Sequence, residues 1–310
     1  MIHEQELIEN INRERPIIEW YSHNWNTKAG KALHTIAYAY FVALSIRLGG
    51  GQTPYLFTAQ SETAKTDKNT SIIWEQIIRY LSAANRSGVI NLCKHSTPEC
   101  RAGCLGHTSG RLRYSVQQRA QHIRTVFLAE NPAFFHIVEL NEVRRHTNRI
   151  VKNGRRSVAR LNGTSDIPYE DLAWYMACLK RMGLGCMFDY TANKTRTRGW
   201  IHTPDISYHL THSTKENDHP NTIQPGSYTV VAIKPDAPLP ATYNGFPVFD
   251  GDKSDMRFLD PEGHVTLGRG KGALKNKQGD ATSFLKPPAH KHNAVLVNVH
   301  IKPRHLKAVK

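Results

Sequence analysis

Strand and helix patterns alternate over most of this chain, and this alternation limits the folds that it can adopt. Helical periodicity occurs at Arg111–Leu128, Phe134–Asn148 and Tyr169–Met182. Apolar runs typical of buried strands occur at Val89–Leu92, Ser157–Leu161, Cys186–Tyr190, Ile206–Thr211, Thr229–Ile233 and Pro247–Phe249. Repeated strand-then-helix units favour an α/β fold with a parallel, (β/α) barrel-like sheet. Right-handed crossovers then place the loops that follow the strands on one face.

The segments before and after this alternating region have other patterns. Helical spacing of apolar residues precedes it at 5–15, Lys28–Arg47 and Ser71–Leu81. In Lys28–Arg47 the predicted buried face holds Leu33, Ile36, Ala37, Tyr40, Phe41 and Leu44. The segment 269–310 has ten Lys or Arg residues and one acid, and its last apolar run, Ala294–Ile301, predicts a closing strand. We therefore predict an N-terminal helical segment (1–87) packing on the barrel, a barrel-like catalytic core (88–268) and a basic C-terminal extension (269–310).

The charge balance indicates the class of partner. The chain has 41 Lys and Arg against 26 Asp and Glu, a formal net charge of +15. Such an excess favours a polyanion, bound through phosphate contacts and counterion release. The alternative is a basic protein whose charges are only solvated. We expect nucleic acid, DNA in preference to RNA, as the partner, and the sequence makes no prediction about the oligomeric state.

The location of the protein is predicted from three observations. The longest apolar run, Ile36–Leu48, is interrupted by polar residues, so we expect no membrane span. The first residues lack the basic and apolar regions of a secretory signal. Five cysteines, an odd number with clustered spacing, argue against a disulfide framework. The sequence therefore predicts a cytoplasmic protein.

Basic residues are concentrated in several short stretches. Seven Lys or Arg and no acid lie between Arg144 and Arg160, and Trp200 follows another basic stretch and could stack on a base. The predicted nucleic-acid-binding residues are Arg144, Arg145, Arg149, Lys152, Arg155, Arg156, Lys194, Arg196, Arg198, Trp200, Arg269, Lys271, Lys275 and Lys277. The alternative for each stretch is an ordinary solvated surface.

A cysteine cluster offers a metal site. Cys93, Cys100 and Cys104 put three of the five cysteines within twelve positions, on the loop after a predicted strand. A zinc site would need a fourth ligand, for which His95 and His107 are the nearest candidates. A [4Fe–4S] cluster on three cysteines would leave one iron open for substrate or a small cofactor. The third alternative is three unrelated, reduced thiols.

Acidic residues follow two of the predicted strands. Asp166 comes after Ser157–Leu161, and Asp250, Asp252 and Asp255 come after Pro247–Phe249. Two carboxylates that meet over a pocket can divide the nucleophile and acid/base roles at a sugar C1′. The alternative is a pair of acidic turns that cap helices.

These segments carry a family resemblance. The cysteine loop, the segment ending at Asp166, the strand Met187–Thr191 and the segment Asp250–Pro261 resemble the phage proteins that carry the "gene product eighty-eight" domain. The resemblance covers about residues 88–285. It implies a bacteriophage origin, the cytoplasm of an infected bacterial cell as the location, and a barrel-like fold.

Two more distant likenesses imply mechanisms. The first is to tRNA-guanine transglycosylases and their DNA-acting phage relatives, which exchange guanine for a 7-deazaguanine by means of two aspartates. It implies Asp166 as acid/base and Asp250, Asp252 or Asp255 as nucleophile, acting on a base flipped out of the duplex.

The second likeness is to radical S-adenosylmethionine enzymes. These enzymes place three cysteines after the first barrel strand and a Gly-rich motif after the second. In this chain the cysteine loop and the later pair Asn162 and Gly163 have the same relative positions. It implies that Asn162 and Gly163 bind the S-adenosylmethionine cofactor.

We therefore expect a phage enzyme that modifies nucleic acid, with base exchange on DNA as the leading reaction. One alternative is a radical enzyme with a three-cysteine iron–sulfur cluster. The other is a non-catalytic DNA-binding protein with a structural zinc.

Overall fold

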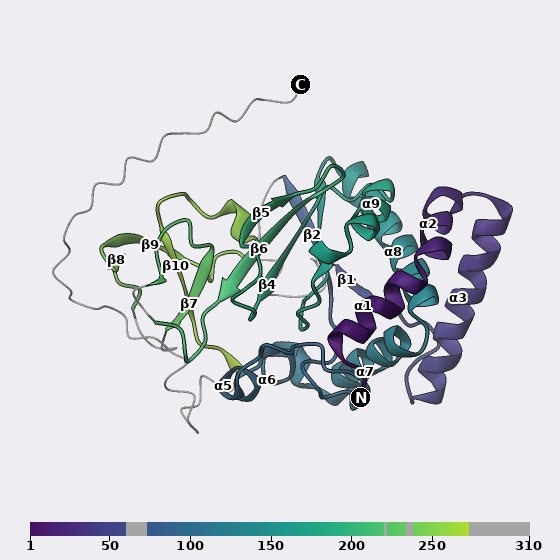
Figure 1. The fold of residues 1–310 in the computed structure, drawn as a ribbon, viewed down its shortest axis with the longest axis horizontal. Coiled ribbons are helices and arrows are strands. Elements are labelled where there is room, and N and C mark those ends of the chain that lie inside the picture. Colours follow the sequence, from purple (N-terminus) through teal and green to yellow (C-terminus); the bar gives the residue numbers. More distant parts are fainter. Residues whose placement is uncertain (60–72, 220–221, 234–237, 273–310) are drawn as a thin grey trace.

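A computed structural model describes residues 1–59, 73–219, 222–233 and 238–272 of the chain (Figure 1). These residues form a mixed α/β fold around one ten-stranded sheet. The strands are β1 (Phe57–Ala59), β2 (Trp74–Arg79), β3 (Arg156–Arg160), β4 (Cys186–Thr191), β5 (Gly199–His202), β6 (Ser207–Ser213), β7 (Thr229–Ile233), β8 (Thr242–Tyr243), β9 (Phe246–Asp250) and β10 (Val265–Arg269).

Parallel pairing dominates the sheet. Its order is β1-β2-β3-β4-β6-β7-β10-β9-β8, and every pair from β2 to β9 along this path is parallel. The outer strands β1 and β8 pair antiparallel with their neighbours, as β5 does with β6. The α/β class and the mostly parallel sheet are confirmed, and closure into a barrel stays a prediction.

Local chemistry marks both ends of α3, one of the described helices. The α-helices are α1 (Glu4–Arg13), α2 (Arg15–Asn24), α3 (Lys28–Arg47), α5 (Pro98–Ala102), α6 (Leu105–Thr108), α7 (Ser115–Glu130), α8 (Pro132–Lys152) and α9 (Ala173–Arg181). The Thr27 hydroxyl accepts a hydrogen bond from the Gly30 amide (3.1 Å) at the start of α3, and Gly49, at φ +74°, follows its end. None of the described helices is long and apolar enough to cross a membrane.

The helices pack mainly against one half of the sheet. Figure 1 shows α1, α2, α3, α8 and α9 together beside β1 to β6, with β7 to β10 at the other end of the molecule. The largest apolar cluster joins α1, α2, α3, α7, α8 and α9 to the inner strands. A smaller cluster on β3 and β4 contains Val158, Cys186, Phe188 and Met256. Because both faces of the inner strands are covered, successive residues of these strands are buried, polar ones included, rather than every second residue.

Several sequence predictions need correction. Ser71–Leu81 was predicted to be a helix, but Trp74–Arg79 is strand β2, whose isoleucines are buried on a covered sheet. Val89–Leu92 is not a strand, since Ile90 makes only an isolated bridge to Ile2. On α3, Ile36 is 57% exposed rather than buried with its predicted neighbours.

The predicted segments also change. The strands β1 and β2 show that the sheet begins within residues 1–87, which the sequence assigned to a helical segment. The strands β1, β5, β8 and β10 were not predicted, because they are short or weakly apolar. The predicted closing strand Ala294–Ile301 lies outside the described residues.

A buried ion pair joins the sheet to the helices. Arg79 on β2 and Glu139 on α8 form a salt bridge in which neither side chain has any exposed area. The Tyr175 hydroxyl on α9 donates to the Glu139 carboxylate (2.5 Å), and the Arg79 guanidinium donates to the Tyr169 hydroxyl. Removal of one member would leave the other as an uncompensated buried charge.

We therefore expect Glu139→Gln to lower the free energy of unfolding by about 3–5 kcal/mol. The matched control is Glu130→Gln, since Glu130 pairs with Arg47 on the surface, where an ion pair contributes at most about 1 kcal/mol. Urea denaturation of both variants measures the difference. Equal losses would show that the buried pair does not join sheet and helices as described.

Candidate active site

A cavity of about 690 Å³ lies at the carboxyl ends of the parallel strands. Most of its walls come from segments at or after the ends of these strands: residues 83–86 after β2, 160–166 at the end of β3 and after it, 190–192 at the end of β4, 213–215 at the end of β6, 251–255 after β9 and 268–271 at the end of β10. Val230 and Val231 of β7 complete this part of the lining. The cysteine segment, residues 93–107, closes a further side. Parallel α/β folds commonly bind ligands at this edge, outside the carboxyl ends of their strands.

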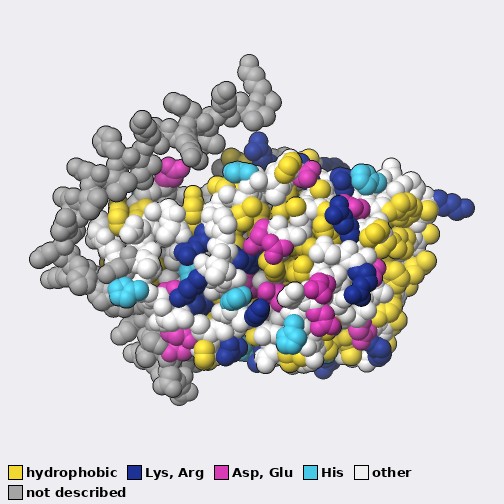
Figure 2. All heavy atoms as spheres, viewed as in Figure 1, with side chains coloured by type: hydrophobic (Ala, Val, Ile, Leu, Met, Phe, Trp, Pro, Cys, Tyr) yellow, Lys and Arg dark blue, Asp and Glu magenta, His cyan; other side chains and the backbone are white. Residues whose placement is uncertain are grey.

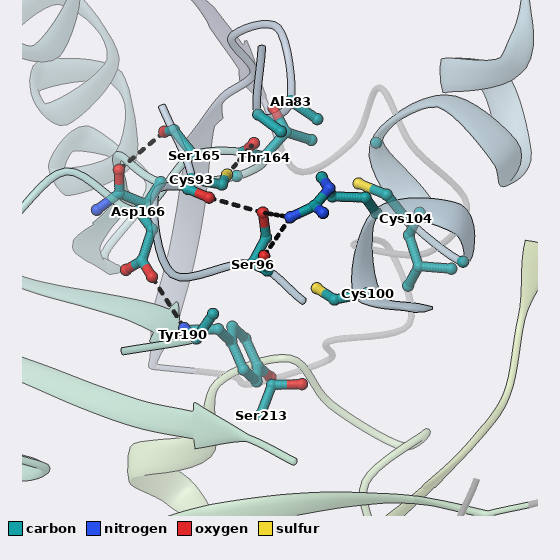
Figure 3. Close-up of a pocket in the computed structure, with 18 of the residues that line it drawn as sticks. Ala83, Cys93, Ser96, Cys100, Cys104, Thr164, Ser165, Asp166, Tyr190 and Ser213 are labelled. Carbon is teal, nitrogen blue, oxygen red and sulfur yellow. Dashed lines mark hydrogen bonds between the residues drawn. The ribbon is translucent and has the colours of Figure 1, made fainter. Parts of the chain in front are cut away.

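The three clustered cysteines all line this cavity. Figure 3 shows their sulfur atoms around the same hollow as Thr164 and Asp166. The Cys93 thiol lies 3.5 Å from the Thr164 carbonyl oxygen, to which it donates. Burial raises the pKa of the Cys93 and Cys104 thiols, so both favour the protonated form. None of the three forms a disulfide.

The two histidines predicted as metal ligands differ in position. His107 lines the cavity, where burial and then Arg86 lower its pKa and favour a neutral imidazole. His95 is not among the residues lining the cavity. Among the described residues, no three His, Cys, Asp or Glu side chains are placed so that they could hold a metal ion. In this arrangement the thiols do not form a ready metal site, so we derive no chemical step through a metal or cluster.

Asp166 is held by donors on two neighbouring segments. One carboxylate oxygen accepts from the Thr191 hydroxyl (3.0 Å) and the Ala192 amide (2.9 Å), and the other is paired with Arg196. Burial raises the pKa of Asp166, and the Arg196 guanidinium opposes this rise. With both oxygens engaged, Asp166 fixes the loop after β3 to the end of β4.

Arg196 was predicted to contact nucleic acid, but the structure buries it. Its side chain is 6% exposed and is paired with Asp166 and, through two 2.6 Å hydrogen bonds, with Glu170. The guanidinium is therefore occupied inside the protein by two carboxylates that lie 26 and 30 residues before it in the chain.

Asn162 and Gly163 shape the loop after β3. The Asn162 backbone amide donates to the Asp189 carboxylate (2.8 Å). The side-chain oxygen of Asn162 accepts from the Ser165 hydroxyl (2.8 Å) and the Ile167 backbone amide (3.0 Å). A Cβ atom on Gly163 would lie 2.5 Å from the carbonyl oxygen of Arg79, so only glycine fits there. Both residues line the cavity, and these contacts serve the shape of its wall.

The acids after β9 are placed differently from one another. Asp252 and Asp255 line the cavity, whereas Asp250 does not. Lys271 lies 2.5 Å from the Asp252 carboxylate and Arg269 lies 3.2 Å away. Burial raises the pKa of Asp252, but these cations outweigh it and the net pKa is lowered.

Arg160 is a site residue that sequence reasoning did not single out. Its guanidinium lies 4.7 Å from the Tyr190 ring centroid and 4.0 Å from the Asp255 carboxylate. Its Nη2 is 3.5 Å from the Gly163 carbonyl oxygen, and its Nε has no hydrogen-bond partner among the described residues. The sequence held one signal for Arg160: it lies near the end of a predicted strand, and a side chain there can reach the carboxyl edge of the sheet.

The predicted nucleic-acid-binding residues do not form one surface. Arg269 and Lys271 line the cavity. The stretch from Arg144 to Arg156 lies on α8 and at the start of β3. The start of β3 belongs to the edge of the sheet opposite the cavity. There Arg149 and Arg155 pair with Glu75 (2.7 and 3.5 Å).

The remaining basic residues are placed as follows. Lys194 pairs with Asp218 (2.7 Å), and Arg198 donates to the Thr229 hydroxyl (3.2 Å). Trp200, on β5, is 37% exposed and packs edge-on against His209. Lys275 and Lys277 lie outside the described residues.

The fold and the cavity define the chain as an α/β protein with a cavity, lined in part by charged residues, at the carboxyl edge of a mostly parallel sheet. The family model named Gene product 88 matches residues 55–286, so the chain belongs to the Gene product 88 family. This match confirms the family resemblance, and it starts at β1 rather than at residue 88. Comparisons with curated proteins and with solved structures found no match.

Asp189 makes the stability of this site depend on pH. Burial raises the pKa of Asp189 from 3.8 to about 7, so the folded chain holds a proton that the unfolded chain releases between these values. The free energy of unfolding should therefore fall as the pH rises through this window. We expect the free energy of unfolding of Asp189→Asn to fall less steeply with pH than that of the wild type. Urea denaturation at about pH 5, 6, 7 and 8 measures both slopes.

The control for this series is Asp205→Asn, which changes an exposed aspartate on the loop between β5 and β6. It should keep the slope of the wild type. An unchanged slope in Asp189→Asn would contradict the assignment of this titration to Asp189.

Proposed function

We propose that this chain modifies nucleic acid and binds one nucleotide of its substrate in the cavity at the carboxyl edge of the sheet. The proposed reaction is base exchange on DNA, of the 7-deazaguanine transglycosylase type, in the cytoplasm of a phage-infected bacterium. A closed barrel remains part of this proposal. The observation that carries it is the set of charges that line the cavity.

That set combines an excess of cations with a few carboxylates. The cations are Arg86, Arg101, Arg160, Lys215, Arg269 and Lys271, and the carboxylates are Asp166, Asp252 and Asp255. Such an excess favours an anionic ligand, and Arg and Lys commonly bind phosphate oxygens in proteins. The volume of about 690 Å³ lies within the range of small-molecule sites, so a single nucleotide is a suitable occupant.

We assign the nucleophile to Asp255. It lines the cavity, and the nearby Arg160 guanidinium stabilises its ionised, nucleophilic form. A bond would form between its carboxylate oxygen and C1′ as the bond from C1′ to the base breaks, and the leaving base would take a proton from water. The incoming base would then bond to C1′ as the bond from C1′ to Asp255 breaks, and would lose its proton to the hydroxide left by that water.

We assign supporting roles to the other two acids. Asp252 orients Lys271 and Arg269, whose positive charges would contact the phosphate next to the target nucleotide. Asp166 would position the loop after β3, because both of its oxygens already accept hydrogen bonds. This changes the acid/base role that the resemblance to transglycosylases implies for Asp166.

We expect Asp255→Asn to lower the incorporation of a labelled 7-deazaguanine into DNA by more than about 10³-fold, because the nucleophile is removed. DNA binding should persist and weaken steeply with added salt. The control is Asp205→Asn, which changes an exposed aspartate outside the cavity. Full incorporation by Asp255→Asn would rule out this mechanism.

A second candidate function rests on the three thiols in the same cavity wall. A three-cysteine cluster there would support radical chemistry on the nucleotide with S-adenosylmethionine, and a zinc ion would support a DNA-binding protein without catalysis. Both need the cysteine segment to bring its thiols closer together than in this structure.

Metal analysis of protein purified without oxygen separates these alternatives. A cluster predicts about four irons per chain and a structural site predicts about one zinc. Either metal should be lost when Cys93, Cys100 and Cys104 are all changed to serine, and Cys178→Ala, outside the cavity, should keep it. Base exchange through Asp255 predicts incorporation whether or not metal is present. No metal in the wild type would exclude both alternatives.

A further inference from the structure

The helix α3 has a second apolar face that points away from the core. Its buried residues are Gly30, Ala37, Phe41, Leu44 and Ser45. On the opposite side lies an exposed row, here called the outer stripe, made of Ala29, Ala32, Ile36, Ala39, Ala43 and Ile46. Successive members are alternately three and four residues apart, which is the spacing of the contact positions in a coiled coil.

An exposed row of this kind is unusual on a helix that already packs against a core. The side facing solvent is normally polar, yet Ile36 and Ile46 are 57% and 51% exposed. Figure 2 shows apolar side chains gathered at the end of the molecule where Figure 1 places α3. A continuous exposed apolar surface marks an interaction site.

We propose that the outer stripe packs against the outer stripe of a second copy of this chain, with the two α3 helices antiparallel. A twofold axis near the middle of α3 pairs Ala29 with Ile46, Ala32 with Ala43, and Ile36 with Ala39. Each isoleucine then faces an alanine, so large side chains fill the spaces beside small ones. A self-complementary surface is what a twofold dimer requires.

The like charges at the ends of α3 are offset by an acid in this arrangement. In the antiparallel pair Lys28 of one copy lies near Arg47 of the other. Arg47 is bound to Glu130 at 2.8 Å, and the Glu130 side chain is 39% exposed, so an acid is present where the two cations meet. Antiparallel helices also place opposite ends of their dipoles side by side.

The size of the contact sets the expected strength. With 20 residues α3 is about 30 Å long, and two such helices bury less than about 1,200 Å². We therefore expect a reversible dimer. Each copy carries a formal net charge of +15, so the association is best measured near 0.3 M salt, where the Debye length is below about 8 Å.

Light scattering during size-exclusion chromatography gives the mass directly. We expect the wild type to approach twice 35.1 kDa as its concentration rises, and Ile36→Glu/Ile46→Glu to remain at 35.1 kDa. The matched control is Val116→Glu, which changes a 69% exposed residue of α7 and should leave the dimer intact. A monomeric wild type at about 200 μM, or a dimeric double variant, would overturn the proposal.

The orientation has its own test. Ile36→Glu and Ala39→Lys should each weaken the dimer alone, because each places a charge twice in the contact. An equal mixture of the two variants should dimerise, because the antiparallel pairing sets the new acid opposite the new base and leaves the other Ile36–Ala39 pair unchanged. Circular dichroism checks that both variants are folded. A mixture that dimerises no better than its components would contradict the antiparallel orientation.

Discussion

Parallel pairing of β2, β3, β4, β6, β7, β10 and β9 is the constraint on which the rest of this structure depends. Because all these strands run in one direction, the segments that follow them gather at one edge of the sheet. Residues as distant in sequence as Ala83 and Lys271 therefore line one cavity. The chemistry that we propose follows from this shared edge, since it brings cations and carboxylates from separate loops to one nucleotide-sized space.

Buried polar groups then hold the walls of that cavity in place. Asn162 and Asp189 join the loop after β3 to β4, and Asp166 binds the end of β4 and Arg196. Each of these groups would be costly to bury alone, and each finds its partner on a neighbouring strand or loop. The same contacts that make the wall rigid also make some conspicuous polar residues unsuitable as catalysts.

The sequence predicted those features that depend on local chemistry. The bounds of α3 match because Thr27 and Gly49 mark its ends, and β7 matches because its run of β-branched residues is short and apolar. The strand β2 was mistaken for a helix, since isoleucines buried on both faces of a sheet can also fit helical spacing. The cysteine loop and the acids at the strand ends do line one cavity, but the reason given for the cysteines was wrong, because Val89–Leu92 is not a strand.

Other features depended on contacts between distant parts of the chain. A basic stretch does not reveal that Arg196 is enclosed by Asp166 and Glu170, or that Arg149 and Arg155 lie at the opposite edge of the sheet from the cavity. Arg160 closes the same basic stretch, and only the fold shows that it reaches Asp255.

The central claim is that the carboxyl-edge cavity, rather than the basic stretch at the other edge, binds a nucleotide. Calorimetric titration with deoxyguanosine monophosphate tests it directly, with Lys271→Met in the cavity and Arg155→Met at the opposite edge as matched variants, their side chains being 34% and 43% exposed. We expect Lys271→Met to weaken binding about tenfold or more and Arg155→Met to leave it unchanged. Binding that survives Lys271→Met and is lost in Arg155→Met would contradict it.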